Sequence, residues 1–304
     1  MRVFVTGATG FIGSAVVQEL INAGHQVLGL ARNDAAADAL ARLGVEAHRG
    51  ELSDTESLAA GARACEGVIH TAFIHDFSQF EANVETDRRA VEALAGALAG
   101  SNRPLVIASG TLMVSHARPG TEQDAPASVD VPRAASEATV LAAARRGVRG
   151  SIVRLPPSVH GDGDHGFVPR LIGIAREKGA SAYVGDGLNR WPAVHRLDAA
   201  HLFRLALEKG SAGARYHGVA DEGVPVREIA EVIGRRLNVP VVAKSPAEAA
   251  GHFGFLGHIL GIDGPASSKL TQERLGWRPV QPGLIPDLDR PNYFEGYSKY
   301  DNRA

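Results

Sequence analysis

The feature that most constrains this chain is its opening, where a β-branched strand runs directly into three glycines spaced three residues apart. The glycines are Gly7, Gly10 and Gly13, and a helix is expected to follow over residues 14–23. In such a turn the first glycine permits a tight bend, the second lets the backbone approach a pyrophosphate, and the third lets the helix pack closely on the strand. The helix N-terminus would present free N–H groups and a partial positive charge to the phosphates. The opening therefore predicts a dinucleotide-binding unit, with a glycine-rich turn that binds no ligand as the alternative.

Strands and helices are expected to alternate along the first half of the chain. The other strands are predicted at residues 25–30, 45–48, 67–71, 104–108 and 150–154, and the other helices at residues 34–43, 54–62, 80–98 and 132–146. This alternation predicts an α/β fold with a doubly wound parallel (Rossmann) sheet and crossovers on both faces. Such sheets bind ligands at the carboxyl ends of their strands, so the chemistry is expected there.

The alternation loosens from Pro156 onward into glycine-rich loops, short helices and a proline-rich tail. We expect residues 1–155, completed by about 193–221, to form a dinucleotide-binding domain. Residues 156–192 and 222–304 are expected to form a smaller C-terminal substrate-binding lobe. Because no low-complexity linker separates the two parts, the lobe is expected to lie over the sheet.

Composition narrows the range of partners. The chain has 304 residues, a net charge of −2 and 44% apolar residues, which is ordinary for a globular protein. The chain lacks the excess of basic residues that would favour binding to nucleic acid or to an anionic membrane surface. It also has no apolar run long enough to cross a bilayer. The single cysteine, Cys65, excludes an internal disulfide and is expected in the core. Because the first strand begins at Arg2 and leaves no room for a signal peptide, we expect a cytoplasmic location. The nucleotide turn and the substrate lobe lead us to expect a small-molecule substrate.

The end of the second strand bears on which dinucleotide binds. NAD-binding sites place an acidic residue there to hydrogen-bond the ribose hydroxyls, but this chain has Ala31 followed by Arg32. Arg32 could grip a 2′-phosphate through charge-assisted contacts. NADP(H) is therefore favoured over NAD(H). The alternative is that Arg32 is a solvated cation and Asp34 takes the ribose role.

Six segments spread along nearly the whole chain resemble the extended short-chain dehydrogenase/reductase family, which includes the NAD-dependent epimerase/dehydratases. They are the nucleotide turn at 6–13, the G-E-L-S-D segment at 50–54, the fourth strand at 68–72, the segment at 153–161 that passes the nicotinamide in the family, the V-H-R-L-D-A-A segment at 194–200 and the L-G-W-R-P segment at 275–279. The turn is the most specific, and the others gain weight from their order. The turn and the resemblance together imply cofactor contacts from Gly7, Thr9, Gly10, Phe11, Ile12, Gly13, Arg32, Leu52, Thr71, Ala72, Phe73 and Pro157.

The chain departs from the family at the catalytic signature, Tyr-x-x-x-Lys at the start of the helix after the fifth strand. The equivalent positions hold Arg133 and Glu137. In the family the tyrosine donates or removes the carbonyl proton and the lysine lowers its pKa. Arginine is permanently protonated and cannot replace the tyrosine, and glutamate would raise the pKa of a nearby acid. Because the two residues are four apart on an expected helix, we interpret them as a surface or cleft-edge ion pair.

Four side chains are candidates to replace the missing acid. Ser109 and Thr111 follow the fifth strand, where the resemblance implies a loop that hydrogen-bonds the substrate carbonyl. Turn chemistry at a strand end is the alternative. His160 and His195 could donate a proton near neutral pH, although a structural histidine is the commoner case.

Two further features of the C-terminal half are less specific. Residues 160–165 hold two histidines and two aspartates, residue types that bind metals. Their spacing matches no metal motif, so no metal site is predicted. Two tyrosines in the tail, Tyr293 and Tyr297, cannot be placed from the sequence.

Three functions are consistent with these observations. The favoured one is an NADP(H)-dependent oxidoreductase of atypical short-chain type that acts on a small carbonyl or alcohol. The alternatives are a sugar-nucleotide epimerase or dehydratase, which the missing tyrosine disfavours, and a non-catalytic dinucleotide-binding sensor or scaffold. The resemblance also implies that a homodimer could form through the helices at 80–98 and 132–146.

Overall fold

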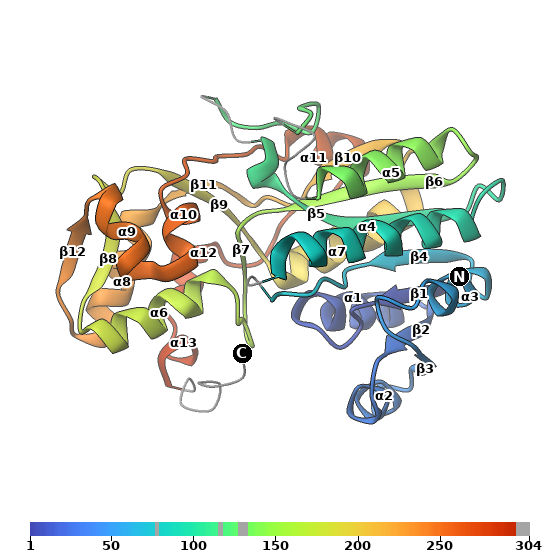
Figure 1. Cartoon of the computed structure of the whole chain (residues 1–304), viewed down its shortest axis with the longest axis horizontal. Helices are drawn as coiled ribbons and strands as arrows, with labels where there is room; N and C mark the ends of the chain where they lie inside the picture. The colour runs from blue at the N-terminus through green and yellow to red at the C-terminus, as the bar shows by residue number, and fades with distance from the viewer. Residues whose placement is uncertain (77–78, 115–117, 127–132, 296–304) are drawn as a thin grey trace.

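The computed structural model describes residues 1–76, 79–114, 118–126 and 133–295, and its centre is a seven-stranded parallel sheet (Figure 1). The strand order is β10-β6-β5-β4-β1-β2-β3, so the chain winds outward in both directions from β1. The strands are β1 (Arg2–Thr6), β2 (Gln26–Ala31), β3 (Glu46–Arg49), β4 (Gly67–His70), β5 (Pro104–Gly110), β6 (Arg149–Leu155) and β10 (Ala214–His217). This order is the doubly wound arrangement, and it confirms the predicted fold class.

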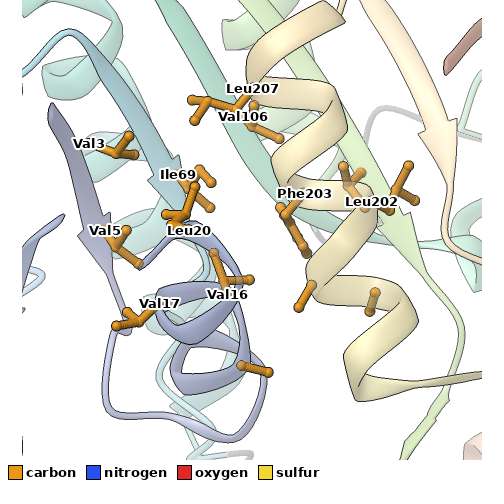
Figure 2. Close-up of a cluster of buried hydrophobic side chains, with 14 of the residues drawn as sticks. Val3, Val5, Val16, Val17, Leu20, Ile69, Val106, Leu202, Phe203 and Leu207 are labelled. Carbon is orange, nitrogen blue, oxygen red and sulfur yellow. The ribbon is translucent and has the colours of Figure 1, made fainter. Parts of the chain in front are cut away.

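Helices cover both faces of the sheet. One face carries α1 (Phe11–Asn22), α2 (Asp34–Ala41) and α7 (Arg196–Lys209), and the other carries α3 (Thr55–Arg63), α4 (Phe80–Ala97) and α5 (Ala134–Ala144). Figure 2 shows the first of these cores, where Leu20 of α1 and Phe203 of α7 meet Ile69 of β4. Both cores are built from fully buried aliphatic side chains, so each helix is held by its apolar face.

The predicted element boundaries are accurate to within about three residues. The first helix begins at Phe11 rather than residue 14, because Gly10 already has the extended conformation of an N-cap. The helix expected at 132–146 begins at Ala134, and Pro132 lies outside the described residues. Cys65 is buried, as expected.

The C-terminal elements pack into a second, smaller layer beside the carboxyl edge of the sheet (Figure 1). A three-stranded sheet has the order β11 (Asp221–Pro225), β9 (Arg190–His195), β7 (Ser158–His160), and β8 (Ser181–Val184) pairs with β12 (Val241–Lys244). The helical elements are α6 (Phe167–Lys178), α8 (Val226–Leu237), α9 (Pro246–Phe253), η3 (Gly254–Leu256), α10 (Gly257–Leu260), α11 (Lys269–Leu275), α12 (Leu284–Leu288) and α13 (Asn292–Glu295). An apolar core that includes Trp191 and Ile229 holds most of these elements together, whereas α11 packs through Leu275 on the core that contains α7.

The L-G-W-R-P segment ties the C-terminal part of the chain back to the central sheet. Trp277 is fully buried in the core that contains α1 and α7, and its indole N–H donates to the carbonyl of Asp198 at 3.0 Å. The Asp198 carboxylate accepts the backbone N–H groups of Val280 and Gln281, each at 3.0 Å. One residue of α7 thereby anchors the whole segment. Among the described residues, no helix is both long and apolar enough to cross a membrane.

We expect Trp277→Ala to lower the free energy of unfolding by about 3–5 kcal/mol, because it empties a fully buried site and removes the indole hydrogen bond to the Asp198 carbonyl. Urea unfolding monitored by circular dichroism measures this change. Val280→Ala is the matched control, because Val280 is 78% exposed three residues away and should shift the value by less than about 0.5 kcal/mol. Equal effects of the two substitutions would contradict the anchoring role.

Candidate cofactor and active site

The nucleotide turn has the geometry that its three glycines predict. Gly7 has a φ of 69°, and a Cβ there would lie 2.7 Å from the backbone nitrogen of Ala72. A Cβ on Gly13 would overlap the carbonyl oxygen of Gly7. Gly10 caps α1 without a side-chain hydrogen bond, and the first turn of α1 holds no acidic residue. The first N–H groups of α1 are therefore free for an anion.

The turn is lined by residues from neighbouring strand ends. Thr71 donates its hydroxyl to the carbonyl of Thr6 at 2.8 Å, and the backbone N–H of Ala72 donates to the Thr6 hydroxyl at 3.4 Å. Thr9 is exposed at the tip of the turn. The Arg196 guanidinium lies over the Phe11 ring, with its central carbon 4.6 Å from the centroid of that ring. The remaining apolar candidates for cofactor contact are all half-buried: Ile12, Leu52, Phe73 and Pro157.

The end of β2 presents a cation. Arg32 is exposed, and its side chain makes no hydrogen bond or ion pair with any described residue. Asn33 caps α2 by accepting the N–H of Ala36 at 2.9 Å. Asp34 pairs with Arg49 at the end of β3, at 2.6 Å. Asp34, the carboxylate that follows Arg32 in the sequence, is therefore already paired, while the Arg32 guanidinium remains available.

A chain of buried polar groups connects β1 to the start of α5. The Thr6 hydroxyl hydrogen-bonds Nδ1 of His70 at 2.8 Å, and Nε2 of His70 lies 3.2 Å from Asp87 on α4. The other oxygen of Asp87 accepts the Ser136 hydroxyl at 2.6 Å. Burial raises the pKa of Asp87, but Arg133 and the hydrogen bonds from His70 and Ser136 outweigh it, so the pKa lies below its usual value. Asp87 is therefore a buried carboxylate held ionised by its partners.

The side chains of Arg133 and Glu137 do not pair with each other, and the predicted surface or cleft-edge ion pair is wrong. Arg133 has a left-handed φ of 68° at the N-cap of α5, so it is not part of the helical i, i+4 row. Its guanidinium donates to the Ala108 carbonyl at 2.6 Å and lies 3.5 Å from Asp87. Glu137 is only 1% exposed and faces Arg154 instead.

The Glu137 carboxylate forms a buried, bidentate ion pair with Arg154 of β6. The two nitrogen–oxygen distances are 2.8 Å and 2.6 Å, and both side chains are almost fully buried. Arg215 of β10 adds a contact at 3.3 Å. The hydroxyl of Ser109 donates to the same carboxylate at 2.9 Å. Glu137 thus occupies the family's lysine position as the centre of a charge network that already engages Ser109.

Thr111 differs from Ser109 in that its hydroxyl has no hydrogen-bond partner among the described residues. It begins the 3-10 helix η2 (Thr111–Val114) directly after β5, and it is 1% exposed. Its hydroxyl oxygen is buried without a partner. Of the two candidates at this strand end, Thr111 alone has its hydrogen-bonding capacity unused.

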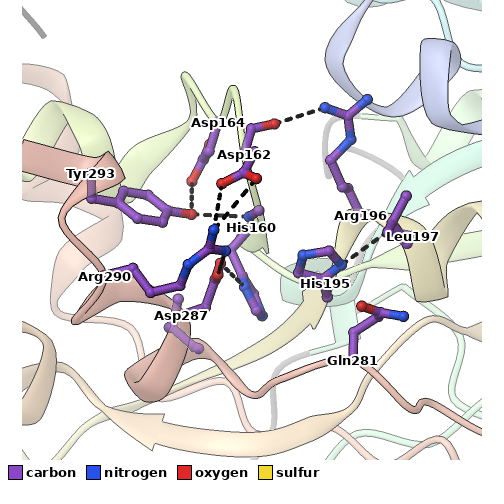
Figure 3. A network of polar contacts seen from close by, with 12 residues as sticks. His160, Asp162, Asp164, His195, Arg196, Leu197, Gln281, Asp287, Arg290 and Tyr293 are labelled. Carbon is purple, nitrogen blue, oxygen red and sulfur yellow. Dashed lines mark hydrogen bonds and ion pairs between the residues drawn. The ribbon is translucent and has the colours of Figure 1, made fainter. Parts of the chain in front are cut away.

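The two candidate histidines lie side by side at the ends of β7 and β9 (Figure 3). Their ring centroids are 5.4 Å apart. Nδ1 of His160 pairs with Asp287 at 2.8 Å, whereas its Nε2 is buried without a partner. Nδ1 of His195 accepts the N–H of Leu197 at 3.3 Å. Burial, and then the neighbouring His160, lower the pKa of His195.

The short C-terminal helices complete this cluster (Figure 3). Tyr293 of α13 accepts the N–H of Gly161 at 3.0 Å and donates to Asp164 at 3.2 Å. Burial raises the pKa of Asp164 to about 7, and the nearby charge of Asp287 adds to it. Arg290 pairs with Asp287 at 2.8 Å and with Asp162 at 3.2 Å. Tyr297 lies outside the described residues.

The candidates therefore fall into two separate groups. Ser109 and Thr111 lie at the end of β5, while His160 and His195 lie in the C-terminal cluster, and among the described residues no hydrogen bond or ring contact joins a member of one group to a member of the other. Within the described part of the chain, no three metal-binding side chains are close enough to hold an ion.

Sequence reasoning missed the groups that organise both sites. His70 and Arg154 carry a signal that could have been noticed, because each is a charged or polar residue within an apolar strand. Asp87 stands among the many charges of α4, and Asp287 lies in the tail. Nothing local distinguishes either from a solvated carboxylate.

Comparison with known proteins places these features in context. Residues 3–219 match the model of the NAD dependent epimerase/dehydratase family. An uncharacterized protein of Schizosaccharomyces pombe is 51% identical over 295 residues, which cover 97% of this chain and 100% of that one. The 2-alkyl-3-oxoalkanoate reductase of Stenotrophomonas maltophilia is 30% identical over 81% of this chain and 78% of its own length.

Solved structures share the fold at lower identity. A dTDP-glucose 4,6-dehydratase from Streptomyces venezuelae with NAD bound gives a TM-score of 0.77 at 23% identity, over 97% of each chain. A UDP-glucose 4-epimerase from Thermotoga maritima with UDP-glucose also gives 0.77, at 20% identity, over 97% of this chain and 99% of that one. At these identities the likeness extends to the fold alone.

We expect Gly13→Ala to lower the free energy of unfolding by about 1–3 kcal/mol, because the added methyl group overlaps the Gly7 carbonyl and forces α1 away from β1. Denaturant titration measures this loss, and the affinity for NADPH should fall with it. Gly96→Ala on α4 is the control, because a Cβ there meets no atom within 4 Å. That substitution should raise stability by up to about 1 kcal/mol. A Gly13→Ala protein of unchanged stability would refute the close-packed turn.

Asp164 predicts a pH dependence of stability. Its folded pKa of about 7 lies above the value near 4 of an unfolded aspartate. The folded state therefore keeps a proton that the unfolded state releases, so the free energy of unfolding falls as the pH rises from about 4 to about 7. In urea unfolding at pH 5 and pH 8, Asp164→Asn should lose less stability between the two values than the unmodified protein. Asp186→Asn, which alters an exposed carboxylate, should leave the difference unchanged.

Proposed function

The chain belongs to the NAD-dependent epimerase/dehydratase family, and we propose that it is an NADP(H)-dependent oxidoreductase acting on a small carbonyl compound or alcohol. The observation that carries the proposal is the pairing of an intact nucleotide turn with an uncompensated Arg32 at the end of β2. The 30% identical relative is named as a reductase of 2-alkyl-3-oxoalkanoates, which is consistent with carbonyl chemistry.

The residues around the turn fit a phosphorylated dinucleotide. The free N–H groups of α1 suit the pyrophosphate. Arg32 suits a 2′-phosphate, and Arg49 is nearby because Ala31 pairs with Arg49 across β2 and β3. Asp34 forms an ion pair with Arg49, and this pair competes with a hydrogen bond from a ribose hydroxyl. When bound in its reduced form, the cofactor supplies a hydride to the carbonyl carbon, and a proton from solvent completes the alcohol.

The residues at the end of β5 would orient the substrate. We assign hydrogen bonding of the carbonyl oxygen to Thr111, whose hydroxyl is unused, with Ser109 held in place by Glu137. Glu137 is bound by Arg154 and Arg215, which leaves it no role as a proton donor. His195 is the candidate proton carrier of the second group, because His160 is fully buried against Asp287 while His195 keeps 7% of its surface exposed.

The alternatives make different predictions. A sugar-nucleotide epimerase or dehydratase needs an acid–base group at the position of Arg133, which a guanidinium cannot supply. A sensor or scaffold would bind the cofactor without turning over any substrate. A panel of carbonyl compounds assayed with bound NADPH separates the oxidoreductase from the sensor. The homodimer through α4 and α5 stays a prediction, which sedimentation would test.

We expect Arg32→Ala to weaken NADPH binding by about ten-fold or more, the factor that corresponds to one lost charge-assisted contact, and to change NADH binding by less than about two-fold. Fluorescence titration of the purified protein with each cofactor measures both affinities. Arg42→Ala, which removes an exposed cation at the far end of α2, should change neither. Equal losses for both cofactors would refute the 2′-phosphate assignment, and no binding of either would overturn the oxidoreductase proposal.

A further inference from the structure

Arg133 lies where three structural elements of the candidate active site meet. Its guanidinium donates to the Ala108 carbonyl of β5, lies 4.6 Å above the Phe73 ring that follows β4, and approaches Asp87 of α4. The side chain keeps 20% of its surface exposed. A stacked and hydrogen-bonded guanidinium is preorganised, so it loses little freedom when it binds a ligand.

The backbone at Arg133 is held in an unfavourable conformation. Its φ of 68° lies in the left-handed region, which costs any residue with a Cβ free energy relative to glycine. Glycine would therefore suit the backbone better at this N-cap. Within the described residues, the Nε of the Arg133 side chain is also buried without a hydrogen-bond partner.

Arg133 keeps hydrogen-bonding capacity that its contacts with the protein do not use. Its one ion pair within the described residues is with Asp87, and the arginines that meet Glu137 form a separate group. Asp87 is already hydrogen-bonded by His70 and Ser136, and its contact with Arg133 is long, at 3.5 Å. A guanidinium has five N–H donors, and Arg133 uses only one of them in a short hydrogen bond with a described residue.

We propose that Arg133 binds an anionic group of the substrate, so that the substrate is a carbonyl compound or alcohol that carries a carboxylate. This inference rests on the proposed function and specifies its substrate class. The two oxygens of a carboxylate match the planar edge of a guanidinium whose face is covered by Phe73. Arg133 thereby replaces the family's proton-exchanging tyrosine by a fixed cation that selects the substrate.

Asp87 is a positioning residue in this arrangement. It contacts Arg133 and Ser136 at the start of α5 and reaches Thr6 beside the nucleotide turn through His70. This chain of contacts sets the position of the guanidinium relative to the nucleotide turn.

The test compares carboxylic acids with their neutral methyl esters. The probes are pyruvate, acetoacetate and phenylpyruvate, each with its methyl ester, bound to the protein with NADPH and followed by quenching of the cofactor fluorescence. The same probes are added to the protein without cofactor, and the shift in Tm is measured. We expect at least one acid to bind about ten-fold or more tightly than its ester, the usual factor for one charge-assisted contact.

Substitutions at residue 133 assign the difference to the guanidinium. Arg133→Gln should abolish the preference for the acid and leave the affinity for the ester unchanged, and Arg133→Lys should keep part of it, because the charge remains while the bidentate edge is lost. Arg133→Gly relieves the left-handed φ but removes the cation that pairs with the buried Asp87, so we expect it to fold with a lower Tm and also to lose the preference. Arg227→Gln, which removes a surface cation paired with Glu231, should behave as the unmodified protein.

Several results would overturn the inference. They are equal affinity for acids and esters in the unmodified protein, a preference that survives Arg133→Gln, or inorganic phosphate raising the Tm more than any of the acids. Failure of the proposed function gives a different pattern, in which NADPH does not bind at all. In that case the Tm shifts measured without cofactor still decide whether carboxylates bind through Arg133.

Discussion

The buried ion pair between Glu137 of α5 and Arg154 of β6 fixes the geometry on which the candidate active site depends. Two charges removed from water are costly unless they are paired and hydrogen-bonded at short distance, and this pair meets both conditions. Removing one partner of such a pair commonly costs about 3–5 kcal/mol. Through the same carboxylate the pair engages Ser109, and through Arg215 it reaches the edge strand β10. The start of α5 is thereby held against the ends of β5 and β6.

That pair also changes what the site can do. A lysine at position 137 would leave a tyrosine at position 133 acidic, whereas a glutamate bound to arginines provides no such effect. The network instead leaves Arg133 as a cation at the strand end, held by Ala108, Phe73 and Asp87. Position 133 therefore offers a fixed cation that can bind an anion, in place of a side chain that exchanges a proton. The nucleotide turn keeps the close packing of α1 on β1.

The C-terminal segment forms the second polar site. Tyr293, Arg290 and Asp287 come from the last helices, yet they contact the loop at 160–164 more than a hundred residues earlier. Asp164 is buried there with a raised pKa. This cluster closes the chain around the end of β7 and orients His160 toward Asp287. Its position beside His195 connects it to the start of α7, and so to the central sheet.

The sequence by itself determined the parallel sheet, its winding and the nucleotide turn, because these follow from short-range patterns: the alternation of strands and helices, and glycines whose spacing permits only one close packing. It also identified positions 133 and 137 as the place of departure from the family. Only the tertiary structure decided their partners, since Glu137 meets Arg154 across 17 residues and Arg133 meets Asp87 across 46. The expected i, i+4 pair requires both residues to be helical, and the left-handed conformation of Arg133 removes that condition. The sheet brings the ends of distant strands together, and this arrangement decides which charged side chains pair.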